Sequence, residues 1–263
     1  MKFKYLVTIV LCFNFFGGCQ PMDPKVETIG NAAIADAAGA MEGAAAIMGS
    51  CPLCTGSPTG IGAVAVVSVI YAIAASEPMA QLYKGSIDKS NKVDLDSNLI
   101  SPLNPYEIIG RNHNYGLKYV DNNSNPNRLV TGIESYDYSI WKEVAYNFES
   151  NNNYIDSGYI AAKSLDVSNI LSTKFSFFLN DSIMSFEKYL GTSSFDQMNR
   201  DKVLEVVKKY RDYLLKSSSQ SAISYLQDEL NKILRPELGY SEQELLFIIF
   251  LTTLKWSTLF WYK

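Results

Sequence analysis

The sequence predicts an all-α protein, built as a Gly/Ala-rich helical hairpin followed by a multi-helix globular domain. Apolar residues recur at helical spacing, as in the stripe Tyr106, Ile109, His113, Leu117 and Val120. The alternation of apolar and polar residues that is typical of strands is rare, and the chain contains no Asn-Gly hairpin turn. With 19% charged and 47% hydrophobic residues, the composition is that of a folded chain.

The N-terminal segment, residues 1–18, has the layout of a secretory signal peptide. Lys2 and Lys4 form a short positive region ahead of an apolar stretch over residues 5–16. Two small residues follow this stretch, which is too short for a transmembrane helix. We therefore expect residues 1–18 to direct export of the chain.

The residues Phe16-Gly17-Gly18-Cys19 resemble the lipobox of bacterial lipoproteins. The resemblance implies that Cys19 receives a diacylglyceryl group, that the chain is cleaved just before it, and that residues 19–27 form a lipidated tether. Gln20 rather than aspartate after the cysteine favours the outer membrane by the enterobacterial sorting rule. The expected location is thus the bacterial cell envelope, with membrane lipid as a partner. The alternative is an ordinary signal peptide that happens to precede a cysteine.

The segment 28–76 is rich in Ala, Gly, Val and Ile and predicts a hydrophobic helical hairpin. Its arms, about 29–48 and 61–75, flank a centre rich in Gly and Pro. In the first arm Ala35, Gly39 and Gly43 recur every fourth residue, in the manner of a glycine zipper. Small residues at this spacing allow helix backbones to approach closely, so they are candidate helix-packing residues and allow self-association through the hairpin.

Two arrangements of this hairpin stay open: insertion in a bilayer, or packing on the folded domain. The second arm is uncharged, but its fifteen residues span only about 22 Å as a helix, against a hydrocarbon core of roughly 30 Å. The first arm carries Asp36 and Glu42, which disfavour a stable transmembrane hairpin.

Cys51 and Cys54 lie in the turn-rich centre of the hairpin and are the candidate disulfide. An even pair of cysteines in an exported chain is typical of such a bond. The alternatives are a redox pair or a metal site. A zinc site needs two further ligands, and the chain contains one histidine, His113. We therefore predict no metal and no cofactor.

After a linker at 77–97, residues 98–263 form the predicted all-α domain. Asn104-Pro105-Tyr106-Glu107 is a helix start signal, with a capping Asn and a Pro at the first helical position. Ser241 and Glu244 form a capping box before an apolar run near the C-terminus, which Lys255 ends after ten residues. Such a run belongs either to a buried core helix or to a membrane span, and its short length favours the core helix. Helices after 104 are expected near 136–149, 158–180, 182–190, 196–217, 220–234 and 242–261.

The segment from Asn104 to Tyr119 is similar to an Asn-Pro…Gly…His-Asn…Leu element of uncharacterised bacterial envelope proteins. Those proteins also carry a Gly/Ala-rich N-terminal segment. The residues that match are Asn104, Pro105, Gly110, His113, Asn114 and Leu117. The resemblance implies no activity.

The sequence favours a non-enzymatic binding, structural or membrane-associating role. A net charge of −4 without a long basic run gives no electrostatic reason to bind nucleic acid. One alternative is a toxin-like protein that inserts the 28–76 hairpin into a bilayer. The other is an enzyme of unknown class that uses His113. We predict no catalytic residue, since a histidine on an apolar stripe is usually a hydrogen-bonded core residue and no nucleophile motif accompanies it.

Overall fold

The computed structural model describes residues 24–50, 64–65, 67–69, 71–72, 75, 103–104, 106–114, 183–236 and 239–261. Each regular element in these residues is an α-helix and none is a strand, so the predicted all-α class is confirmed. Several predictions fall outside the described residues: the signal segment 1–18, the linker 77–97, and the helices at 136–149 and 158–180.

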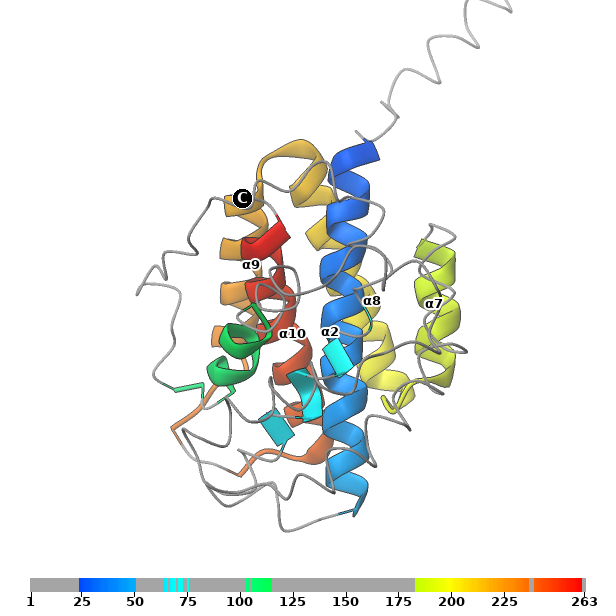
Figure 1. Ribbon diagram of the computed structural model, residues 1–263, viewed down its shortest axis with the longest axis vertical. Helices are drawn as coiled ribbons and strands as arrows, with labels where there is room; N and C mark the ends of the chain where they lie inside the picture. Colours follow the sequence, from blue (N-terminus) through cyan, green and yellow to red (C-terminus); the bar gives the residue numbers. More distant parts are fainter. Residues whose placement is uncertain are drawn as a thin grey trace, which may run out of the picture.

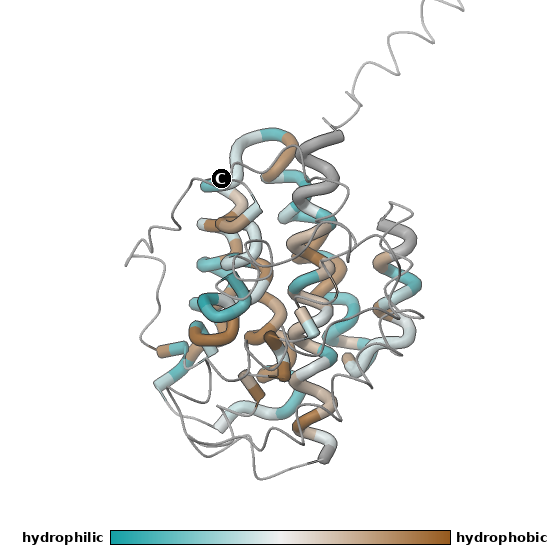
Figure 2. Tube along the Cα trace, in the orientation of Figure 1, coloured by the Kyte–Doolittle hydropathy of each residue, from teal (hydrophilic) through white to brown (hydrophobic). Residues whose placement is uncertain are grey.

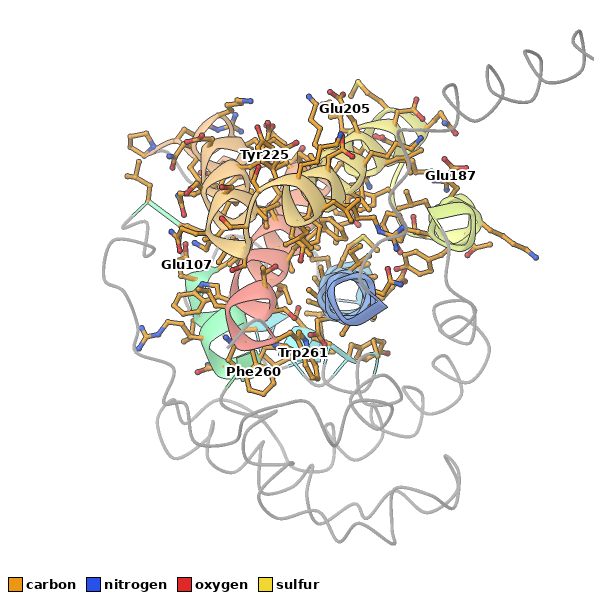
Figure 3. All side chains as sticks on the ribbon, turned by 90° about the horizontal axis from the view of Figure 1, so that it is seen from above. Glu107, Glu187, Glu205, Tyr225, Phe260 and Trp261 are labelled. Atoms are coloured by element: carbon orange, nitrogen blue, oxygen red, sulfur yellow. The ribbon has the colours of Figure 1, made fainter. Side chains whose placement is uncertain are left out.

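The central element is α2, Pro24–Ser50, which carries the first arm of the hairpin. It begins before residue 29, inside the segment 19–27 that the sequence assigned to the tether. Proline is well tolerated at the first helical position, because the amide hydrogen that it lacks has no partner within the helix there. Residues 30–44 are buried on every face of the helix. Figure 3 views α2 nearly along its axis, with other helices around it.

The C-terminal helix α10, Glu242–Trp261, runs antiparallel to α2 and packs along it (Figure 1). Its start is the predicted capping box: Ser241 N donates to Glu244 Oε2 at 2.7 Å, and Glu244 N donates to Ser241 Oγ at 3.3 Å. Residues 245–258 are all buried, as predicted for a core helix. Figure 2 shows its apolar composition against the more polar outer helices.

Three further helices, α7 (Ile183–Thr192), α8 (Gln197–Lys216) and α9 (Ser219–Asn231), complete the described bundle. α8, α9 and α10 follow one another as antiparallel neighbours (Figure 1). Asp196 and Ser218 cap α8 and α9, each accepting a hydrogen bond from an amide three residues on. These helices match the ranges expected at 182–190, 196–217 and 220–234, because local caps and an apolar stripe fix their limits.

The described residues of the second arm, 64–65, 67–69, 71–72 and 75, are helical and buried against α2. A Cβ on Gly39 would lie 2.5 Å from Tyr71 O, and one on Gly43 would lie 2.7 Å from Val67 O. The two arms therefore approach at backbone distance at these glycines. Residues of both arms belong to the same hydrophobic core as α8, α9 and α10. The hairpin therefore packs on the folded protein, which is one of the two arrangements that the sequence left open.

Candidate functional site

Buried polar side chains gather where α2 and the helix at 107–114 meet α10. We call this group the α10 polar network. It contains charged, amide, hydroxyl and indole groups, all of them nine-tenths or more buried. Its members are Asp36, Asn104, Glu107, His113, Asn114, Thr252, Lys255, Trp256, Ser257 and Trp261.

The helix at 107–114 is held close to α10 by its cap and by one glycine. Asn104 Oδ1 accepts a hydrogen bond from Tyr106 N at 3.0 Å, as expected for a capping Asn. A Cβ on Gly110 would overlap the side chain of Trp256. Glycine at position 110 therefore allows Trp256 to lie flush against the helix, and this brings Glu107 and His113 within reach of α10 and α2.

The Glu107 carboxylate is the centre of the first half of the network. Its Oε1 accepts from Lys255 Nζ at 2.6 Å, and its Oε2 accepts from the indole nitrogen of Trp256. Lys255 Nζ also donates to Gln227 Oε1 on α9 at 2.9 Å. Asn104 Nδ2 donates to Thr252 Oγ1 at 2.8 Å. Both charges are thus removed from water and compensated by each other and by neutral polar groups.

The Asp36 carboxylate is the centre of the second half. Its Oδ2 accepts from Trp261 Nε1 at 2.8 Å and from the Ser257 hydroxyl, both on α10. Its Oδ1 lies 3.0 Å from His113 Nε2, with both side chains fully buried. Asn114 then connects the histidine back to α10: its Oδ1 lies 3.1 Å from His113 Nδ1, and its Nδ2 donates to the Trp256 carbonyl at 2.7 Å.

Burial changes the titration of two side chains in this core. It lowers the pKa of the Lys255 ammonium, and the negative charge of Glu107 offsets part of that effect. On the other side of α2, burial and the nearby Glu42 carboxylate hold the pKa of the Tyr189 hydroxyl well above its ordinary value. Tyr189 donates to Glu42 Oε1 at 3.0 Å, so this acid of α2 is also hydrogen-bonded inside the bundle.

The network does not have the geometry of a nucleophilic catalyst. In a serine triad the hydroxyl bonds to the histidine, and the aspartate orients the histidine from its other side. Here the Ser257 hydroxyl donates to Asp36 instead of His113, and all three side chains are closed off from solvent. Within the described part of the chain, no group of three His, Cys, Asp or Glu residues could hold a metal ion.

Sequence reasoning placed His113 in the core, but it did not find the charged members of the network. The sequence predicts Glu107 as part of a helix start and Lys255 as the charged residue that ends an apolar run. In the structure the Lys255 side chain is 0% exposed, so the buried surface of α10 continues past it to Trp261. An available signal was that Gly110, His113 and Asn114, all matched by the element 104–119, recur at helical spacing. Together with the capping Asn104, they contact α10 or Asp36.

The other predicted site residues divide into two groups. Ala35, Gly39 and Gly43 lie on the buried surface of α2. The lipidation site Cys19 and the candidate disulfide Cys51 and Cys54 lie outside the described residues. No protein-family model, no curated protein and no solved structure matches this chain.

Proposed function

We propose that this protein is a lipid-anchored component of the bacterial cell envelope with a non-enzymatic binding or structural role. The signal-like segment 1–18 and the lipobox-like residues that end at Cys19 support the anchor. A diacylglyceryl group carries two acyl chains, and two chains are what stable membrane attachment usually needs. The folded bundle then requires no second membrane signal.

The observation that carries this proposal is the packing of α2. Residues 30–44 are enclosed by protein, and the acidic side chains Asp36 and Glu42 are hydrogen-bonded to Trp261 and Tyr189. A helix that entered lipid alone would expose both carboxylates to hydrocarbon at a cost of several kcal/mol, about 3 kcal/mol for each charge near the bilayer centre. The packed hairpin therefore favours a tethered, closed bundle as the resting form.

The lipid anchor predicts the fate of a Cys19→Ser variant. Full-length protein expressed in a bacterium with radiolabelled palmitate should carry the label and sediment with membranes. The variant should lose all label and stay uncleaved, because the thiol that accepts the diacylglyceryl group is absent. The matched control is Cys51→Ser/Cys54→Ser, which removes two other thiols and should keep the label. Label on Cys19→Ser, or none on the parent, would contradict the anchor.

A second candidate function, membrane perturbation, is favoured by one observation. Among the described residues, α10 (Glu242–Trp261) is the helix whose length and apolar composition suit a membrane span. A core helix of a soluble bundle has the same properties, and most of α10 is buried. Its entry into a bilayer would require separation of Lys255 from Glu107 and of Trp261 from Asp36. The network therefore opposes release of α10.

Dye release from vesicles of phosphatidylethanolamine and phosphatidylglycerol separates the two functions. The lipid-free mature chain (residues 19–263 with Cys19→Ser) should release no dye if the closed bundle is the functional form. A Glu107→Ala variant loosens the contact that holds α10, so it should release more dye than the parent if α10 inserts. Glu205→Ala, which removes an exposed acid that is ion-paired at the same 2.6 Å, is the control. A Glu107→Ala variant that releases no more dye than the parent and the Glu205→Ala control would reject the second candidate.

A further inference from the structure

The contact between Asp36 and His113 determines where protons lie in the core. His113 Nε2 and Asp36 Oδ1 are 3.0 Å apart, and both side chains are 0% exposed. Neither atom has a well-aligned hydrogen-bond partner among the described residues. The contact between them is therefore electrostatic, and its strength depends on the charges of the two groups.

The hydrogen bonds around the His113 ring fix the protonation of its other nitrogen, Nδ1. The Trp256 backbone carbonyl can only accept, so the amide group of Asn114 that lies 2.7 Å from it must be the NH₂. Asn114 Oδ1 then faces His113 Nδ1 at 3.1 Å and can only accept as well. Nδ1 therefore carries a hydrogen, and a neutral ring would turn the bare lone pair of Nε2 toward Asp36.

A bare Nε2 opposite an ionised carboxylate would place two acceptors 3.0 Å apart in the core. One proton on either atom removes this repulsion, as an imidazolium beside a carboxylate or as a neutral ring beside a carboxylic acid. We propose that the Asp36–His113 contact holds one proton that the unfolded chain does not bind at mildly alkaline pH. This proton stabilises the packing of α2 and the helix at 107–114 on α10, and we call the protonated contact the latch. The bundle then loosens as the pH rises.

Other ionisable groups near this contact are engaged with their own partners. Lys255 of α10 pairs with Glu107 of the helix at 107–114. Glu42 of α2 accepts from Tyr189 of α7, and Arg211 of α8 donates to Asn31 of α2. Among the described residues, the other groups that bond to Asp36 are the Ser257 hydroxyl and the Trp261 indole, which carry no charge. The described segments also contain other ionisable residues, among them Tyr71, Tyr106, Arg111 and Tyr210.

The direction of the pH effect follows from counting protons. In an unfolded chain histidine is mostly neutral above about pH 6.5 and aspartate is ionised above about pH 4. Above about pH 6.5 the folded chain therefore binds one proton more, and stability falls as pH rises. Below about pH 4 the unfolded chain binds two protons where the folded contact holds one, so stability falls again. The latch contributes most between these limits.

Asp36→Asn is the variant that tests the latch. Asparagine keeps an oxygen that can accept from Ser257 and Trp261, and its amide can donate to a neutral His113, so no extra proton is needed. Between pH 7 and 8.5, the unfolding equilibrium constant of the lipid-free mature chain should rise about tenfold per pH unit more steeply in the parent than in Asp36→Asn. Equal slopes in urea titrations would overturn the proposal.

NMR of the parent gives a readout that requires no variant. His113 is the only histidine in the chain, so the ring nitrogen signals need no assignment by mutation. At pH 8 we expect Nδ1 to be protonated, with Nε2 protonated as well or facing a protonated Asp36 carboxyl. A neutral ring with its hydrogen on Nε2, or a bare Nε2 beside an ionised carboxylate, would overturn the latch. If Asp36→Asn does not fold, His113→Gln should flatten the same pH dependence, because its amide donates without titrating.

Discussion

Replacing Glu107 with alanine is expected to lower the free energy of unfolding by about 3–5 kcal/mol, since the variant leaves a buried ammonium without the carboxylate that faces it. Lys255 Nζ lies 2.6 Å from Glu107 Oε1, and the Lys255 side chain is 0% exposed. The substitution also removes the acceptor of the Trp256 indole. Urea unfolding of the lipid-free mature chain, followed by tryptophan fluorescence and circular dichroism, measures the change.

Two variants show whether burial is the cause of this effect. Glu205→Ala breaks an exposed pair with Lys209 that has the same 2.6 Å separation, and it should leave the unfolding midpoint unchanged. In the background of Glu107→Ala, the additional change Lys255→Met should restore part of the lost stability, since it removes the unpaired charge. A Glu107→Ala variant as stable as Glu205→Ala would contradict the buried ion pair.

Replacing Gly39 with leucine is expected to destabilise the protein by about 3 kcal/mol or more, the upper end of the range for overpacked cores. Even the first side-chain atom would lie 2.5 Å from the Tyr71 carbonyl oxygen, and 2.9 Å from Ala72 Cα. These are backbone atoms of the second arm, so relief requires a shift of a whole helix. Thermal unfolding followed by circular dichroism measures the loss.

The same helix supplies a matched control. Gly49 is an exposed residue of α2, and a Cβ at this position meets nothing within 4 Å. Gly49→Leu should be neutral, or stabilising by up to about 1 kcal/mol, because leucine favours helix more than glycine does. Equal tolerance of leucine at positions 39 and 49 would mean that the arms are not in backbone contact. Gly39→Leu is for the same reason a poor probe of membrane insertion, since it disturbs the folded bundle itself.

The helices could be predicted from the sequence wherever their signals are local. The Ser241–Glu244 capping box and the apolar stripe of α8 each lie within a few turns of the helix that they define. The start of α2 could not be placed from the sequence, because Pro24 is compatible with a tether and with a first helical position alike. Whether the hairpin packs on the protein could not be decided from local sequence, since its partners are far away in the chain.

The α10 polar network could not be predicted for the same reason. Glu107 and Lys255 are separated by 148 residues, and Asp36 and Trp261 by 225. In the sequence, Glu107 is in a position suited to a helix cap, and Lys255 ends an uncharged apolar run. Their burial depends on the arrival of Trp256 at Gly110, a contact between two distant segments. Only the inward position of His113 followed from helical spacing alone.

The early start of α2 has a mechanical consequence. With Cys19 lipidated as proposed, at most about 17 Å of extended chain separates the anchor from Pro24. A pull on the membrane attachment is then transmitted directly into α2, the buried helix that packs against α10 and α8, and not into a peripheral element. Strain at the envelope surface would load the interior of the bundle along the axis of α2, where the hydrogen bonds of Asp36 and Glu42 resist sliding.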